Sequence, residues 1–209
     1  MKIRLACILA ALALSAFATA AQEKAEYSID HAKSKLEINV YKAGLLKAFG
    51  HDHLIRASEI SGRVEFDAQK IENSSVSLKV GAKSLSVIDP GESEKNRLEI
   101  QTTMTGSQVL DVAKYPEIVF SSTSVSVAKK DADGWVLTVA GKLALHGVEK
   151  PVSLSLHFHM EGGQLVAMGE VFLLQTEYHI TPVIVAGGSI KVKDKLRIAF
   201  AIVATKMKS

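Results

Sequence analysis

Two histidines flank an aspartate in the segment AFGHDHLIRAS, residues 48–58, and these residue types are the ones in the chain best suited to chemistry. His51 and His53 are two positions apart, so in an extended segment both imidazoles lie on one face and Asp52 lies on the other. The pair could supply two of the three or four ligands of a zinc or copper ion, with Asp52 orienting them. The same residues could instead form an acid–base pair, or a polar rim that meets the head group of a ligand.

A metal site needs further ligands, and the other histidines are weakly placed to provide them. His179 could approach the same end of the molecule, whereas His31 belongs to an exposed first turn. His146 precedes a glycine at the end of a predicted strand, where a hydrogen bond to turn backbone is the simplest role. We therefore keep metal binding by His51 and His53 as an alternative hypothesis and expect no resident metal or cofactor.

His157 and His159 flank Phe158 in a predicted strand, so the two imidazoles share the face opposite Phe158. A large aromatic side chain favours the inside of a sheet, and this places Phe158 inward. We therefore predict that both imidazoles point to solvent; in the opposite orientation, the two imidazoles would line the interior.

Several classes of function lack their usual sequence signals. The chain has no G-x-S-x-G elbow, no GxGxxG motif and no P-loop. Its single cysteine, Cys7, lies within the first 20 residues, so the remainder has no disulfide and no thiolate ligand. Beyond residue 20, 23 basic residues face 22 acidic ones, which is not the basic excess that nucleic-acid binding requires. We expect a binding protein, not an enzyme, with no nucleic-acid partner.

Residues 1–20 have the pattern of a cleaved signal peptide. Lys2 and Arg4 give a positive start, residues 5–17 are mostly apolar, and Ala18-Thr19-Ala20 forms a small-residue cleavage pattern. The apolar run is too short for a comfortable membrane span. The sequence therefore predicts export, most simply to a bacterial periplasm, and one domain over residues 21–209.

Most of the remaining chain alternates apolar and polar residues with a period of two. About eight such runs, among them SKLEINVYK, GWVLTVAGKLAL and DKLRIAFAIVAT, are separated by glycine-containing turns. This pattern predicts an all-β protein, with an antiparallel sheet closed as a barrel or paired as a sandwich. Residues 91–114 lack the alternation, and we expect one or two short helices there, with Ser107 as an N-cap. Such a helix could cover one end of a barrel.

Five segments carry a more specific signal: YSIDHAKSKLEINV, ISGRVEFD, VLDVAKYPEIVFSSTSV, VAGKLALHGVEKPVSLSL, and YHITPV followed by GGSIKVKDKLRIAFAI. In this order they resemble the YceI-like family over nearly all of residues 27–206. The Tyr-Pro before a strand ending in Phe, and Leu-x-x-His-Gly-Val-x-Lys-Pro, are the most specific pieces. Departures from the family pattern at residues 50–54 and 177–180 fall in segments that we expect to border a cavity.

The resemblance implies a lipocalin-like antiparallel barrel of about eight strands that holds a long-chain amphiphile. A polyisoprenoid, an isoprenoid quinone or a fatty-acid derivative would be typical. Burial of such a tail gains about 0.8 kcal/mol per CH₂, so binding needs no catalytic residue. A packed structural or accessory barrel without a ligand stays open as a further alternative, as do a homodimer and a transient membrane contact. The expected ligand-binding residues are Phe49, His51, His53, Leu54, Phe66, Phe120, Trp135, Phe158, Phe172 and His179.

Overall fold

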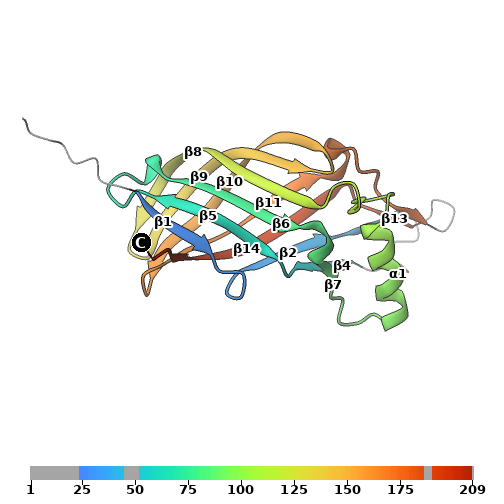
Figure 1. Ribbon diagram of the computed structural model, residues 1–209. Helices are drawn as coiled ribbons and strands as arrows, with labels where there is room; N and C mark the ends of the chain where they lie inside the picture. The colour runs from blue at the N-terminus through green and yellow to red at the C-terminus, as the bar shows by residue number, and fades with distance from the viewer. Residues whose placement is uncertain (1–23, 45–51, 186–189, 209) are drawn as a thin grey trace, which may run out of the picture.

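The computed structural model describes residues 24–44, 52–185 and 190–208, and in these ranges the chain is dominated by β-strands (Figure 1). The strands and the α-helix are β1 (Ala25–Ile29), β2 (Lys35–Val40), β3 (Lys42–Ala43), β4 (His53–Ala57), β5 (Ile60–Phe66), β6 (Ser75–Gly81), β7 (Leu85–Val87), α1 (Glu94–Thr105), β8 (Glu117–Asp131), β9 (Gly134–Leu145), β10 (Val148–Glu161), β11 (Gln164–Leu174), β12 (Ile184–Val185), β13 (Ile190–Val192) and β14 (Lys195–Lys206).

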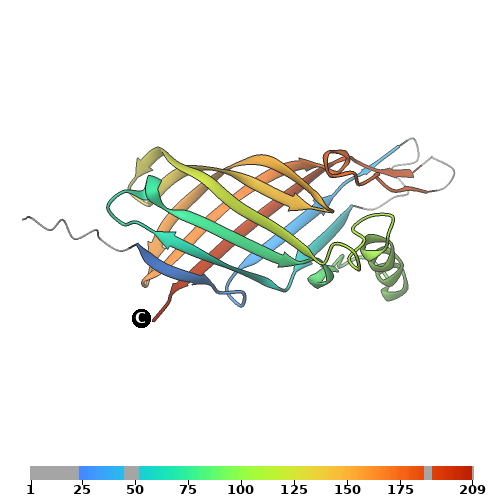
Figure 2. The same ribbon diagram turned by 45° about the horizontal axis from the view of Figure 1, so that its top comes forward.

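Within the described ranges, eight strands form a closed antiparallel barrel. They follow the order β1, β5, β6, β8, β9, β10, β11 and β14, and pairing of β14 with β1 completes the ring. The tilted strands of the barrel are visible in Figure 2. The prediction of a closed antiparallel barrel is confirmed, and the sandwich alternative is wrong because the sheet has no break between β1 and β14.

The barrel wall is longer on one side because β14 pairs with two strands in succession. Its end pairs with β1, where Ala204 lies opposite Ile29, and its start pairs with β2, where Phe200 lies opposite Leu36. The strands β4 and β7 continue this extension beyond β2. A small separate sheet of β12, β13 and β3 lies at the same end as α1, away from the C-terminus (Figure 1).

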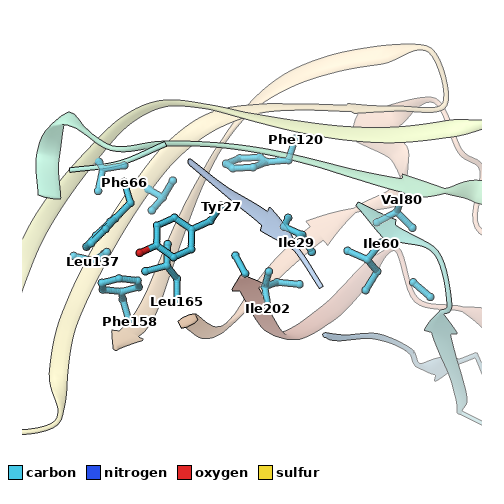
Figure 3. Packing of buried hydrophobic residues seen from close by; sticks show 14 of the residues in the cluster. Tyr27, Ile29, Ile60, Phe66, Val80, Phe120, Leu137, Phe158, Leu165 and Ile202 are labelled. Atoms are coloured by element: carbon cyan, nitrogen blue, oxygen red, sulfur yellow. The ribbon is translucent and has the colours of Figure 1, made fainter. Parts of the chain in front are cut away.

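The alternation of residue types along the strands builds the core. On β10, Leu154, Leu156 and Phe158 face the interior, whereas Ser153 and Ser155 are exposed. The same alternation on the other strands directs apolar side chains from every part of the ring toward one interior (Figure 3). Since side chains of successive strand residues point to opposite faces, this two-residue period is sufficient to define an inside and an outside.

The helical insertion contains one α-helix in the described residues. Ser93 caps α1, with its Oγ accepting a hydrogen bond from the N–H of Asn96 at 3.2 Å. The prediction of Ser107 as an N-cap is wrong, because residues 107–110 form turns and the N–H of Leu110 returns to the carbonyl of Met104. Gln101 joins α1 to β7 through hydrogen bonds with the backbone of Leu85 and Val87. No described helix combines the length and the apolar character that crossing a membrane would need.

Candidate ligand-binding site

The barrel encloses a cavity of about 660 Å³, and its wall is overwhelmingly apolar. Apolar side chains from β5, β6, β8, β9, β10, β11 and β14 of the ring contribute to the wall. This volume lies within the range of about 300–1,000 Å³ that is typical of small-molecule sites. A fully packed core has few voids larger than a water molecule, so the interior of this barrel is a cavity and not a fully packed core.

Two glycines in the wall leave room for the rings of neighbouring phenylalanines. A Cβ added to Gly141 would lie 2.6 Å from ring carbons of Phe120, and one added to Gly169 would lie 2.9 Å from Cζ of Phe200. Real Cβ atoms do not approach so closely, so both rings occupy space that only glycine leaves free. The phenylalanines therefore cover the wall at these points, and the glycines make room for them.

One end of the cavity is closed by aromatic side chains, and we call Tyr27, Phe66, Trp135 and Phe158 the aromatic end. Ring centroids are 6.2 Å apart for Tyr27 and Phe66, 5.5 Å for Phe66 and Phe158, and 5.7 Å for Trp135 and Phe158. Figure 3 shows Tyr27, Phe66 and Phe158 gathered on one side of the core. Tilted and edge-on contacts of this kind stabilise a cluster beyond its area of burial.

The other end carries the charged side chains of the cavity wall and most of its polar ones. We call this group of residues the polar end: Tyr41, Lys42, His53, Glu99, Gln175, Tyr178 and Lys191. Six of these residues belong to β3, β4, β13, α1 and the short 3₁₀ helix η4 (Gln175–Tyr178). Tyr41 directly precedes β3. Glu99 and Lys191 are exposed, so the cavity reaches the molecular surface at this end.

His53 is held at the polar end by a buried carboxylate. Its Nδ1 lies 2.7 Å from Oδ2 of Asp89, and the N–H of Leu54 donates to Oδ1 of Asp89. Asp89 is only 5% exposed, so these hydrogen bonds replace the water that its carboxylate loses on folding. The arrangement fixes the imidazole ring in the cavity wall. Sequence reasoning missed Asp89, because an aspartate before Pro90 and Gly91 has the pattern of an ordinary turn.

Asp52 has a different role from its neighbour. It is exposed, and its Oδ1 accepts a hydrogen bond from the backbone N–H of Lys42 at 2.9 Å. Asp52 directly precedes β4, so this hydrogen bond joins the start of β4 to β3. The contact is in keeping with the prediction that Asp52 points away from the histidine face.

Tyr178 and Gln175 are polar residues of the wall that sequence reasoning also missed. Tyr178 is 1% exposed and Gln175 is 6% exposed, and both line the cavity. Burial, together with the nearby carboxylate of Glu177, raises the pKa of the Tyr178 hydroxyl, so it remains protonated at neutral pH. No sequence signal separates these residues from the exposed Thr176 and Glu177 in the same short helix.

The predicted aromatic residues divide between the inside and the outside of the barrel. Phe66, Phe120 and Phe158 line the cavity as predicted, and Trp135 packs behind Phe158 without lining it. The prediction for Phe172 is wrong: it lies outside the barrel, 47% exposed, with Nζ of Lys195 4.2 Å from its ring centroid. Its neighbours on β11 take the inward positions, and alternation leaves Phe172 on the outer face.

The predictions around the histidine segment have mixed outcomes. His53 lines the cavity, whereas Leu54 is absent from its wall because the adjacent Ile55 points inward. Phe49 and His51 lie outside the described residues. His179 is exposed, in a left-handed conformation with φ of 57°, and the buried residues on either side of it face the core instead. The expectation that His179 meets a ligand inside the barrel is therefore wrong.

The remaining histidines lie as expected. Phe158 faces the cavity, and His157 and His159 lie on the opposite side of β10 with ring centroids 5.8 Å apart. Nδ1 of His146 lies 3.0 Å from the carbonyl oxygen of Tyr178, so His146 bonds backbone and not a ligand. His31 is exposed in a turn. Across the described residues, no group of three or more His, Cys, Asp or Glu side chains is arranged to hold a metal ion.

A closed antiparallel barrel around an apolar cavity with a polar end is the architecture of the lipocalin-like binding proteins. Residues 27–204 match the model of the YceI-like domain. The chain therefore belongs to the YceI-like family, as its sequence motifs predict.

Relatives in sequence and in structure agree with this assignment. The UPF0312 protein of Pseudomonas savastanoi pv. phaseolicola is 35% identical over 157 residues, 74% of this chain and 73% of that protein. The UPF0312 protein of Shewanella denitrificans is 30% identical over 140 residues, 66% of this chain and 64% of that protein.

Solved structures show the same fold at low identity. BcnA of Burkholderia cenocepacia superimposes with a TM-score of 0.65 at 20% identity, covering 85% of this chain and 99% of BcnA. The YceI protein of Campylobacter jejuni has a TM-score of 0.54 at 14% identity, covering 74% of this chain and 85% of that protein. These likenesses concern the fold.

Proposed function

We propose that this protein binds and carries an amphiphile with a long isoprenoid or acyl tail, held inside the barrel. The observation that carries the proposal is the apolar cavity of about 660 Å³ that reaches the surface at one end. Each buried CH₂ group of a tail contributes about 0.8 kcal/mol, so a chain of ten such groups offers roughly 8 kcal/mol before the entropic costs of binding. The family resemblance to polyisoprenoid-binding barrels supports the same class of ligand.

The two ends of the cavity give the ligand a direction. The tail points toward the aromatic end, where the wall has few polar atoms, and the head group stays near His53 and the other residues of the polar end. The opposite orientation would place a polar head against Phe66 and Phe158, where it would lose its hydrogen bonds to water without replacement.

Binding without catalysis is the function that the polar end supports. His53 and Asp89 resemble the base and the orienting residue of a hydrolase, but such a pair acts through a nucleophile or a positioned water. The serines in the cavity wall, Ser74 and Ser75, border the hairpin between β5 and β6 and not the polar end. Under this proposal the pair positions His53 for a head group.

The proposed setting is the periplasm, reached through the leader of residues 1–20. Expression in a bacterial host with and without these residues, followed by cell fractionation, tests this. We expect the full chain to appear in the periplasm with its N-terminus at Ala21 and the truncated chain to stay in the cytoplasm. Equal distribution of the two forms would contradict export through the leader.

Native mass spectrometry of the protein purified from its own host tests the proposed function directly. We expect a co-purifying lipid of several hundred daltons in the wild type. Leu154→Trp places a large side chain in the cavity and should abolish this adduct, while Ser153→Trp, one residue along β10 but on the exposed face, should retain it. A wild-type protein with no lipid that also fails to bind added lipid would support the packed accessory barrel, and a metal adduct would support the metal hypothesis.

A further inference from the structure

Three lysines occupy alternate positions where β13 leads into β14, and we call Lys191, Lys193 and Lys195 the lysine row. All three are exposed. The two residues between them are partly buried: Val192 lines the cavity, and Asp194 accepts hydrogen bonds from η4. The alternation of this segment therefore places its lysines on the outer surface.

The lysine row lies against exposed apolar side chains. Lys191 is the strand partner of Ile184, and Lys195 is the strand partner of Leu174. Directly opposite residues of an antiparallel pair share one face, with Cβ atoms about 4.5–5.5 Å apart. Nζ of Lys195 also lies 4.2 Å from the ring centroid of Phe172. We call the lysine row together with these three exposed apolar residues the basic apolar patch.

The basic apolar patch borders the open end of the cavity. Leu174 and Lys191 belong both to the patch and to the cavity wall, and β13 lies at the end of the barrel away from the C-terminus (Figure 1). A long apolar tail is poorly soluble in water, so its exchange between a cavity and a bilayer is favoured when the mouth of the cavity touches the bilayer. The patch is placed where such a contact would form.

The positive charge of the patch is not neutralised by ion pairs. Within the described ranges, no carboxylate forms an ion pair with a lysine of the row, whereas Lys24, Lys33 and Lys129 elsewhere on the barrel each pair with an acidic residue. The helix α1 also borders the mouth, and it carries as many acidic as basic residues. The β13 side of the mouth is therefore the side that attracts an anionic surface.

We propose that the basic apolar patch docks the mouth of the barrel onto the surface of an anionic lipid bilayer. The lysine row contacts lipid phosphates, and Phe172, Leu174 and Ile184 enter the boundary between head groups and acyl chains. A bilayer accepts protruding apolar side chains without a matching pocket, which a protein partner would have to supply. The proposal rests on the proposed function for its purpose, because docking would deliver or collect the carried lipid, but the docking itself needs no ligand in the cavity.

Flotation with lipid vesicles tests the charged part of the patch. One set of vesicles contains phosphatidylcholine alone, and the other contains equal parts of phosphatidylcholine and phosphatidylglycerol. All variants are expressed from the full sequence, so that any contribution of the N-terminus is the same in each. We expect the wild type to prefer the anionic vesicles. Replacement of all three lysines of the row by glutamine should weaken this binding about 100-fold, since each lysine near an anionic surface contributes about fivefold.

A matched control removes the same charge elsewhere. The variant Lys24→Gln/Lys33→Gln/Lys129→Gln has the same net charge as the variant of the lysine row, and its substitutions lie outside the patch. Since charges beyond a Debye length of about 10 Å are largely screened, this control should bind within about threefold of the wild type. Equal losses in the two triple variants would show that net charge alone drives binding and would overturn the proposal.

A second pair of variants tests the apolar part of the patch. Ile184 is 54% exposed within the patch, and Leu98 is 59% exposed on α1, at the same end of the molecule but outside the patch. We expect Ile184→Ser to weaken binding to anionic vesicles about tenfold and Leu98→Ser to change it less than about twofold. Unchanged melting temperatures show that these surface variants are folded.

The salt dependence and the cavity variant complete the test. Salt at about 1 M, where the Debye length is about 3 Å, should release most of the bound wild type. Equal binding to both vesicle sets would overturn the proposal, and binding to neither set would overturn it in favour of a protein partner. Leu154→Trp, which fills the cavity, should dock like the wild type. A wild type that docks on vesicles but takes up no lipid would reject the proposed function alone.

Discussion

The two ends of the barrel cavity bury different kinds of side chain. At the aromatic end, Tyr27, Phe66 and Phe158 are buried and contact one another through their rings. At the polar end, the wall includes charged and hydrogen-bonding groups, and the buried polar residues Asp89 and Gln175 lie there. The contrast shows that one strand pattern places a packed aromatic cluster at one end of the barrel and hydrogen-bonding side chains at the other. The residue types at the strand ends set this difference.

Different interactions should stabilise the two ends: aromatic packing at one and buried hydrogen bonds at the other. Aromatic packing stabilises in proportion to the apolar area that it removes from water, whatever ligand is present. Buried polar groups stabilise only when each has its partner, as the Asp89 carboxylate has in His53 and in the Leu54 N–H. The stability of the polar end therefore depends on individual hydrogen bonds, whereas that of the aromatic end depends on packing.

The largest effect should come from Phe158→Ala at the aromatic end. Phe158 is 6% exposed and contacts the rings of Phe66 and Trp135, so truncation should lower the free energy of unfolding by about 3–5 kcal/mol. Urea unfolding measures this. The control is Phe172→Ala on the outer face of β11, which should cost about 1 kcal/mol or less. Similar losses in the two variants would contradict the assignment of inside and outside.

An intermediate effect should come from Asp89→Ala at the polar end. The substitution removes the acceptor of His53 and of the Leu54 N–H, and hydrogen bonds to a buried carboxylate are worth about 1.5–3 kcal/mol. We expect the free energy of unfolding to fall by about 2 kcal/mol, again measured in urea. Asp52→Ala removes an exposed carboxylate that accepts a hydrogen bond from the Lys42 N–H, and it should cost less than about 1 kcal/mol. A larger loss for Asp52→Ala would refute the role given to the buried pair.

The smallest effect should appear at alkaline pH and depend on Tyr178. Its pKa in the folded protein is raised above the unfolded value of about 10, so the folded state binds this proton more tightly. The contribution to stability is fully present below about pH 10 and is lost as the pH rises through the folded pKa. The wild type should therefore lose stability above pH 10 more steeply than Tyr178→Phe, as unfolding midpoints from pH 8 to 11 would show. Parallel curves would mean that this hydroxyl is not buried.

Sequence patterns predicted the wall of the barrel better than its ends. The alternation on β10 places Phe158 inward and His157 and His159 outward, because the two-residue period of a strand is a local property of the backbone. The choice of Phe172 as a wall residue ignored that period in favour of side-chain size, and it failed for that reason. The helical insertion was recognised by its lack of alternation, whereas its cap at Ser93 was missed.

The polar end was predicted only in part because its contacts join distant segments. His53 was identified from its spacing to His51, but its partner Asp89 lies 36 residues away and has no sequence mark of burial. Tyr178 and Gln175 are likewise distinguished from their exposed neighbours only by the packing of η4 against the turn at His146 and against Asp194.

By itself, the sequence determined the class of fold, the family and the apolar character of the interior, since these follow from strand periodicity and from motifs that are contiguous in the chain. Tertiary structure alone decided that the interior is a cavity closed by aromatic rings at one end and lined by His53, Gln175 and Tyr178 at the other. The physical reason is that closure of the β1–β14 pair and the buried hydrogen bonds depend on long-range packing, and their free energies exist only when the whole barrel is assembled.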